Sequence, residues 1–166
     1  MATVTLGGDT VHTSGSLPEI GSIAPDFKLT ATDLSTKTNN DYSGHHLVLN
    51  VFPSVDTGTC AQSIRAFNKE ASNLENTKVL CISKDLPFAM ARFCGAEGLD
   101  NVVSLSDYKD GSFGEAYGLN FVDGAFDTLL SRCVIIIDSK GKVLYTEQVP
   151  EIADEPNYEA ALKALK

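Results

Sequence analysis

The sequence has no surplus of positive charge, no long hydrophobic run and no Cys-x-x-Cys pair. Its 166 residues include 13 Lys and Arg against 22 Asp and Glu, so the formal net charge is −9 at pH 7. A chain with this charge repels a phosphate backbone instead of releasing its counterions. No apolar run approaches the length that spans a bilayer. We therefore expect neither nucleic acids nor membranes among its partners.

The N-terminus also lacks the features of an export signal. Residues 1–9 contain neither a basic n-region nor an apolar h-region, so we expect a cytoplasmic protein. Permanent disulfides are rare in that reducing compartment, and four cysteines there indicate metal or redox chemistry more than a structural framework. The three histidines do not stand at spacings typical of a zinc site, so we expect no metal.

Length and composition predict one domain. The chain is 43% apolar, which is enough for one substantial core, and no repeat, low-complexity tract or linker interrupts it. Residues 3–6 and 10–13 flank Gly7-Gly8-Asp9, which is a hairpin signal. We expect residues 1–166 to form a single domain, with residues 1–16 as an N-terminal hairpin extension.

From residue 47 onward the apolar pattern alternates between strand and helix periodicity. It predicts strands at 47–52, 78–83, 101–105, 133–138 and 142–148 and helices at 59–75, 87–94, 112–117 and 157–165, after short strands near 27–29 and 34–38. This alternation favours a sheet with helices on both faces and parallel early strands. The three-residue link 139–141 makes the last two strands antiparallel. The predicted class is α/β: a thioredoxin-like fold with a central mixed sheet flanked by helices.

Cys60 is the most informative residue, because it follows a strand and a loop and lies at the start of a predicted helix. The apolar run 47–52 precedes it, and Ile64, Phe67 and Leu74 follow at helical spacing. At a helix N-terminus, unpaired N–H groups and the positive end of the helix dipole favour a thiolate over a thiol. The thiolate is the reactive form, so Cys60 is a candidate nucleophile.

The other cysteines have different contexts. Cys81 and Cys133 are embedded in apolar strands, where a cysteine usually packs as a small hydrophobe. Cys94 ends the predicted helix 87–94, which Gly95 would cap. It is either a packing residue or a resolving thiol for Cys60. If a disulfide between Cys60 and Cys94 is structural, the reduced protein should be much less stable than the oxidised one. If the disulfide is catalytic, the reduced protein must be a stable working state.

The run Pro53-x-x-x-Thr57-x-x-Cys60 resembles the active-site motif of the peroxiredoxins. The similarity covers essentially the whole chain, including residues 80–83, 92–99 and 155–162. Within the family, the chain looks specifically like the bacterial thiol peroxidases of the atypical two-cysteine type.

The resemblance implies a role for five side chains. Cys60 would be the peroxidatic thiol, and Thr57 would hydrogen-bond the thiolate and the peroxide oxygens. Pro53 would shield the site from water, and Arg132 would keep Cys60 ionised and polarise the peroxide. Cys94 would be the resolving cysteine, so that both thiols belong to one chain and the helix ends around them unwind when the disulfide forms.

The resemblance also implies an activity and its partners. The protein would reduce hydrogen peroxide and organic hydroperoxides, would be recycled by thioredoxin, would need no flavin, haem or metal, and would form a homodimer packed near the active-site loops. Two other classes remain open. A thiol-disulfide oxidoreductase acting on proteins usually has the Cys-x-x-Cys pair that is missing here, and a redox sensor would react about once and stop.

Overall fold

A seven-stranded mixed sheet forms the centre of the protein. The structure, a computed structural model, describes all residues 1–166. Its strands are β1 (Thr3–Leu6), β2 (Asp9–His12), β3 (Lys28–Ala31), β4 (Thr36–Thr38), β5 (His46–Val51), β6 (Thr77–Ser83), β7 (Val103–Ser106), β8 (Cys133–Ile137) and β9 (Val143–Gln148). The strand order is β4-β3-β7-β6-β5-β8-β9, and β1 and β2 form a separate hairpin. Strands β5, β6 and β7 are parallel to one another, whereas β8 and β9 are antiparallel, as the sequence predicted.

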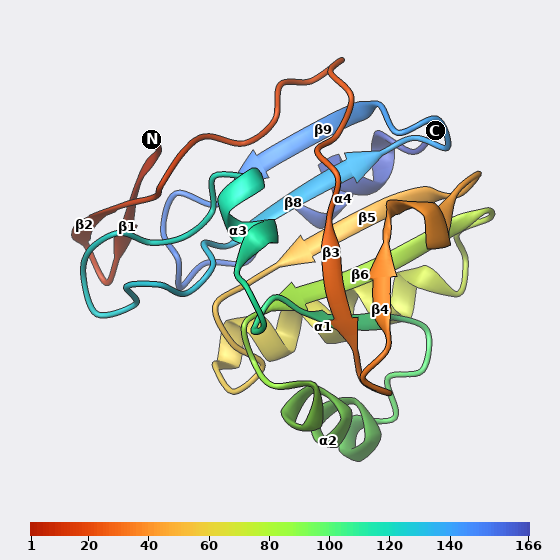
Figure 1. The fold of residues 1–166 in the computed structure, drawn as a ribbon, viewed down its shortest axis with the longest axis horizontal. Coiled ribbons are helices and arrows are strands. Elements are labelled where there is room, and N and C mark those ends of the chain that lie inside the picture. Colours follow the sequence, from red (N-terminus) through yellow and green to blue (C-terminus); the bar gives the residue numbers. More distant parts are fainter.

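Helices cover both faces of the sheet. They are α1 (Gly58–Ala71), α2 (Pro87–Glu97), α3 (Ser112–Ala116) and α4 (Tyr158–Lys163), with a 3₁₀ helix η1 (Asn39–Tyr42) before β5. Figure 1 shows α3 in front of the sheet and α1 and α4 behind it. This arrangement confirms the predicted thioredoxin-like class.

Strand β5 separates two apolar cores. Leu47, Leu49 and Val51 pack into one core together with Phe113 of α3. Between them Val48 points into the other core, where its cluster includes Ile64 and Phe67 of α1, Met90 of α2 and Ala161 of α4. Because both faces of the strand are covered, its sequence is almost continuously apolar instead of alternating. The second core is the one that holds Cys60.

The end of α2 differs from the prediction. A helix over 87–94 capped by Gly95 was expected, but the helix continues to Glu97 and Gly98 caps it in the left-handed conformation, with φ +65°. Gly95 and Ala96 are compatible with a helical backbone, so a glycine alone did not mark the end. The helix α1 ends at Ala71, earlier than the predicted residue 75, because Asn73 and Leu74 form turn hydrogen bonds to Glu70 and Ala71.

The N-terminal hairpin is tied to the segment that follows β9. The Glu151 carboxylate accepts hydrogen bonds from Thr5 Oγ1 at 2.7 Å, Gly7 N at 3.0 Å and Gly8 N at 3.1 Å. Gly7 and Gly8 both have positive φ, which places their amides on one side of the turn. Backbone bonds from Thr5 N to Pro150 O and from Ile152 N to Thr5 O complete the attachment.

We expect Glu151→Gln to remove an acid-dependent part of the stability. Its hydrogen bonds, first that from Thr5 and then those from backbone amides, lower the pKa of Glu151 from 4.5 to about 2. A depressed pKa means that this contribution is complete above the ordinary value and is lost as the pH falls toward the folded one. The Tm of the wild type should therefore fall more steeply than that of the variant between these values. Exposed Glu159→Gln is the control, and parallel curves for wild type and Glu151→Gln would contradict the expectation.

No helix in the structure is both long enough and apolar enough to cross a membrane.

Candidate active site

Cys60 lies in the first turn of α1, where the sequence placed it. Strand β5 ends at Val51, the loop 52–57 follows, and α1 begins at Gly58 with Thr57 as its N-cap residue. The Cys60 side chain is 0% exposed. The first-turn amides of a helix have no intrahelical acceptor, so they give the sulfur a locally positive surrounding.

Thr57 contacts the sulfur directly. Its Oγ1 donates to Cys60 Sγ at 2.6 Å and lies 3.2 Å from the carbonyl oxygen of Ser54. The extended backbone of Thr57, with φ −94° and ψ 143°, turns this hydroxyl toward the first turn of α1. A hydroxyl that donates to sulfur stabilises its anionic form more than its neutral form.

Arg132, which is far from Cys60 in the sequence, contacts the same sulfur. It precedes β8, is only 2% exposed, and its Nη2 donates to Cys60 Sγ at 3.1 Å. Its Nε donates to the carbonyl oxygen of Ile152 at 2.8 Å, which fixes the plane of the guanidinium. Its Nη1 is buried and has no partner.

The burial of Arg132 indicates the charge on Cys60. The guanidinium forms no ion pair with a carboxylate. A buried cation without a counter-charge costs several kcal/mol, at least about 3 by the cost of breaking a buried pair. Of its hydrogen-bond partners, Ile152 O is neutral and only Cys60 Sγ can carry a negative charge. The arrangement therefore favours a Cys60 thiolate paired with the Arg132 guanidinium, and it leaves Nη1 free to donate to a ligand oxygen.

Cys133 and Cys81 take no part in this arrangement. Cys133 packs with the core on the opposite face of the sheet from Cys60, as expected from the alternation of side chains after Arg132. Burial raises the pKa of Cys81 to about 12 and that of Cys133 also above its usual value. Both side chains are fully buried free thiols that pack as small hydrophobes.

Pro53 is buried in the loop that leads to the site. Its neighbours Phe52 and Val55 are buried as well and belong to the core that holds Cys60. The loop therefore adds apolar side chains to the core that holds Cys60. A group of three or more His, Cys, Asp or Glu side chains that could hold a metal ion does not occur in the structure.

Cys94 is half-buried on α2 and packs against the same core as Cys60. Its Sγ lies 3.4 Å from Ser104 Oγ on β7, and burial raises the pKa of its thiol. The carbonyl oxygen of Cys94 accepts bonds from the Gly98 and Leu99 amides, so the residue lies inside the last turn of the helix and not at its last position, as the prediction had it. All four cysteines are free.

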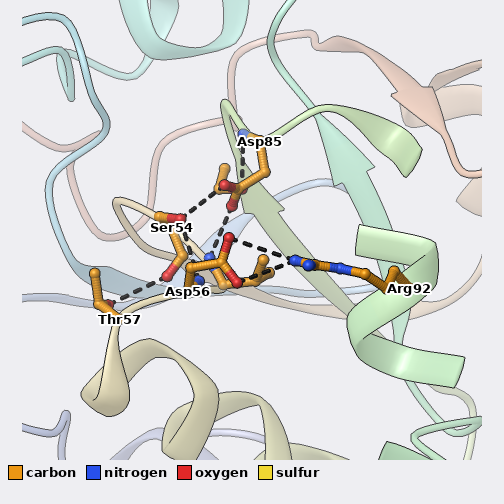
Figure 2. A network of polar contacts seen from close by, with 7 residues as sticks. Ser54, Asp56, Thr57, Asp85 and Arg92 are labelled. Carbon is orange, nitrogen blue, oxygen red and sulfur yellow. Dashed lines mark hydrogen bonds and ion pairs between the residues drawn. The ribbon is translucent and has the colours of Figure 1, made fainter. Parts of the chain in front are cut away.

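Sequence reasoning gave no role to Asp85, although its place in the fold contains a signal. Asp85 follows β6, and the Cys60 loop follows β5; these strands are parallel neighbours, so both segments leave the sheet at the same edge. Figure 2 shows the Asp85 carboxylate directed at Ser54 of that loop. The carbonyl oxygen of Ile152, which orients Arg132, was also missed because a backbone acceptor has no signature in the sequence.

Comparison with known proteins places the chain in a family. Residues 19–162 match the Redoxin family. The sequence is 52% identical to the thiol peroxidase of Mycobacterium tuberculosis and 50% identical to that of Corynebacterium glutamicum, in each case over 99% of both chains. The fold matches the crystal structure of a peroxiredoxin-like protein from Aquifex aeolicus with a TM-score of 0.92 and 35% identity, over 98% of this chain and 95% of that one. The chain therefore belongs to the Redoxin family, as a member of its bacterial thiol peroxidases.

Proposed function

We propose that the protein is a peroxidase in which Cys60 reduces hydrogen peroxide and organic hydroperoxides. One observation carries the proposal: a buried arginine without a carboxylate partner donates to the sulfur of a cysteine that also accepts a hydrogen bond from Thr57. This geometry holds a nucleophile and keeps unused donors beside it. The thiol peroxidases to which the chain is similar support the same reaction.

In the first step the Cys60 thiolate attacks the terminal oxygen of the hydroperoxide. A sulfur–oxygen bond forms, the oxygen–oxygen bond breaks, and the leaving alkoxide or hydroxide takes up a proton to become an alcohol or water. The sulfur is oxidised to a sulfenic acid while the peroxide is reduced. The guanidinium of Arg132, including its unpartnered Nη1, and the Thr57 hydroxyl stabilise the charge that develops on the oxygens. Buried Pro53 keeps water away from this step.

In the second step Cys94 resolves the sulfenic acid. Its thiol displaces the sulfenic hydroxyl, so that a Cys60–Cys94 disulfide forms and water leaves. A disulfide requires Cα atoms within about 7 Å, and each sulfur must first leave its present partners. Cys60 must leave Thr57 and Arg132, and Cys94 must leave Ser104. The start of α1 and the end of α2 therefore unwind between the reduced and oxidised forms.

An external dithiol then returns the enzyme to its reduced state. The reductant attacks the disulfide through a thiolate, and two exchange steps restore both thiols. We propose that thioredoxin supplies this dithiol. We also propose that residues 1–166 act as one domain in the cytoplasm and as a homodimer packed near the active-site loops. Leu86 and Phe88, which are 52% and 65% exposed at the start of α2, support this contact by presenting apolar surface there.

A coupled assay tests the function. Thioredoxin, its reductase and a limiting amount of the protein are mixed with hydrogen peroxide or an organic hydroperoxide, and consumption of reductant is followed. An enzyme consumes many equivalents of peroxide per chain. A sensor would consume about one equivalent and stop, and that result would refute the proposed function. Replacing thioredoxin by glutathione tests the proposed reductant separately.

We expect Cys94→Ser to keep the first step and lose the second. Cys60 should still be oxidised once, but its sulfenic acid has no partner and should accumulate or oxidise further to sulfinic acid. Thioredoxin-dependent turnover should fall at least about tenfold, since the intramolecular disulfide is the form that exchanges with the reductant. Mass spectrometry of the peroxide-treated protein measures both outcomes. Cys133→Ala, which removes another buried thiol, is the control, and full turnover of Cys94→Ser would exclude Cys94 as the resolving residue.

A further inference from the structure

A polar network joins the loop before Cys60 to the segment that leads into α2. We call it the Asp85 latch; it consists of Ser54, Asp56, Ser83, Asp85 and Arg92. Figure 2 shows its two parts, one around the Asp85 carboxylate and one formed by Asp56 and Arg92. The loop carries Thr57, which donates to Cys60 Sγ, and α2 carries Cys94. The latch therefore connects the two segments that must rearrange when the disulfide forms.

Asp85 is the centre of the latch. Its Oδ1 accepts from Ser54 Oγ at 2.7 Å, and its Oδ2 accepts from the Val55 amide at 2.8 Å and from Ser83 Oγ at 2.6 Å. The backbone carbonyl of Asp85 accepts in addition from Ser106 Oγ. Three donors to one half-buried carboxylate form charge-assisted bonds, which are about twice as strong as neutral ones. This part of the latch holds the loop firmly to the end of β6.

The contact continues from Asp85 to the sulfur through Ser54. The Ser54 hydroxyl accepts from the Asp56 amide at 3.2 Å, and the Ser54 carbonyl accepts from the Thr57 amide at 3.3 Å. Thr57 Oγ1 lies 3.2 Å from that carbonyl and donates to Cys60 Sγ. Ser54 and Thr57 thus connect Asp85 to the reacting sulfur. The position of Asp85 therefore affects the position of the Thr57 hydroxyl.

The second part of the latch reaches α2 itself. Arg92 Nη2 donates to the two Asp56 carboxylate oxygens at 3.1 and 3.5 Å. Both side chains are about two-thirds exposed, so this ion pair contributes little to stability alone. Its place matters more, because Arg92 stands two residues before Cys94 on the helix that has to unwind. The pair restrains the movement of α2 relative to the loop.

We propose that Asp85 is a positioning residue and that the latch sets the balance between the reactive arrangement and the opened one. This inference rests on the proposed function of Cys60 and Cys94. With the latch closed, Thr57 is in place and Cys60 reacts with peroxide. With the latch open, the loop and α2 can move and Cys94 can reach the sulfenic acid. Weakening the latch should therefore slow the first step and speed the second.

Rapid-quench kinetics on Asp85→Asn tests this opposition. The asparagine has the same shape, but its amide nitrogen cannot accept from two donors as a carboxylate oxygen does. The sulfenic acid of Cys60 is trapped with dimedone, and the disulfide is measured by mass spectrometry. We expect the rate of sulfenic acid formation to fall at least about tenfold, as for loss of a group that positions a transition-state donor. The rate of disulfide formation should rise about threefold or more, because opening costs less.

Two further variants separate the latch from a general loss of stability. Arg92→Gln breaks only the contact to α2, so it should speed disulfide formation without slowing sulfenic acid formation. Ser54→Ala removes a single hydroxyl and should reproduce Asp85→Asn in weaker form if that variant does not fold. Asp138→Asn is the matched control, since Asp138 accepts from the Lys140 and Lys142 amides in a turn outside the network.

The proposal predicts opposite changes in the two rates, which a purely structural role does not produce. Unchanged rates, or a proportional slowing of both steps in Asp85→Asn and Ser54→Ala, would overturn it. Failure of the proposed function would look different, because the wild type itself would then form no sulfenic acid at Cys60.

Discussion

Cys60→Ser should abolish peroxide turnover while leaving the fold intact. The serine hydroxyl is similar in size to the thiol and can accept the hydrogen bonds from Thr57 Oγ1 and Arg132 Nη2. It is not ionised at neutral pH, however, and an oxygen nucleophile cannot form the sulfenic acid on which the cycle depends. We expect turnover to fall at least about 10⁴-fold, which corresponds to the loss of the nucleophile in a covalent mechanism. The thioredoxin-coupled assay measures this directly.

Cys81→Ala is the matched control for Cys60→Ser. It removes a thiol that is equally buried, in β6, but that has no hydrogen bond to Thr57 or Arg132. Its turnover should stay within about twofold of the wild type, because the substitution removes neither the nucleophile nor a donor to the Cys60 sulfur. Peroxide turnover that survives in Cys60→Ser, with normal thermal stability, would show that another residue is the nucleophile.

Arg132→Met should produce the second largest loss. Methionine fills a similar volume but removes the positive charge, so Cys60 loses the partner that favours its thiolate and the donor that stabilises the leaving oxygen. We expect the rate of sulfenic acid formation to fall by about 10²–10³, in line with the removal of a transition-state donor. Thermal stability should change little at neutral pH, because the Cys60 sulfur can take up a proton as a neutral thiol and then leaves no unpaired charge buried. The ultraviolet absorbance of the thiolate should decrease at neutral pH.

Arg132→Lys distinguishes charge from geometry. Lysine keeps the charge but has no planar fork that can bond Ile152 O and Cys60 Sγ together. Its rate should lie between those of the wild type and Arg132→Met. If Arg132→Met oxidised at the rate of the wild type and kept its thiolate absorbance, the pairing of the buried cation with the sulfur would have no role in the reaction.

The sequence predicted the fold well where local patterns decide the structure. The strand, loop and helix around Cys60 follow from an apolar run, a polar loop and apolar residues at helical spacing, and the structure has all three. The predicted end of α2 was wrong because both Gly95 and Gly98 can cap a helix. Only the backbone hydrogen bonds to Cys94 O show that Gly98 does so. Helix ends depend on such competing local contacts.

The contacts of the site were less accessible from the sequence. Arg132 is 72 positions from Cys60, and only the family resemblance connected the two. The bonds of Asp85 depend on β5 and β6 being parallel neighbours, so topology had to be known before the carboxylate could be placed. Residues far apart in the chain meet through the packing of the sheet, and no spacing rule describes that distance.

The segment 151–153 gives the N-terminal hairpin a purpose beyond covering one end of the molecule. The Glu151 carboxylate accepts from the hairpin turn, and Ile152 O accepts from the Arg132 guanidinium. Ala153 O accepts from the hydroxyl of Thr59, which is next to Cys60. Residues 151–153 thus connect the first twelve residues to the Cys60 site by hydrogen bonds. A chain without the N-terminal hairpin would keep every catalytic side chain, but it would lose contacts that hold residues 151–153 in position beside Arg132 and Thr59.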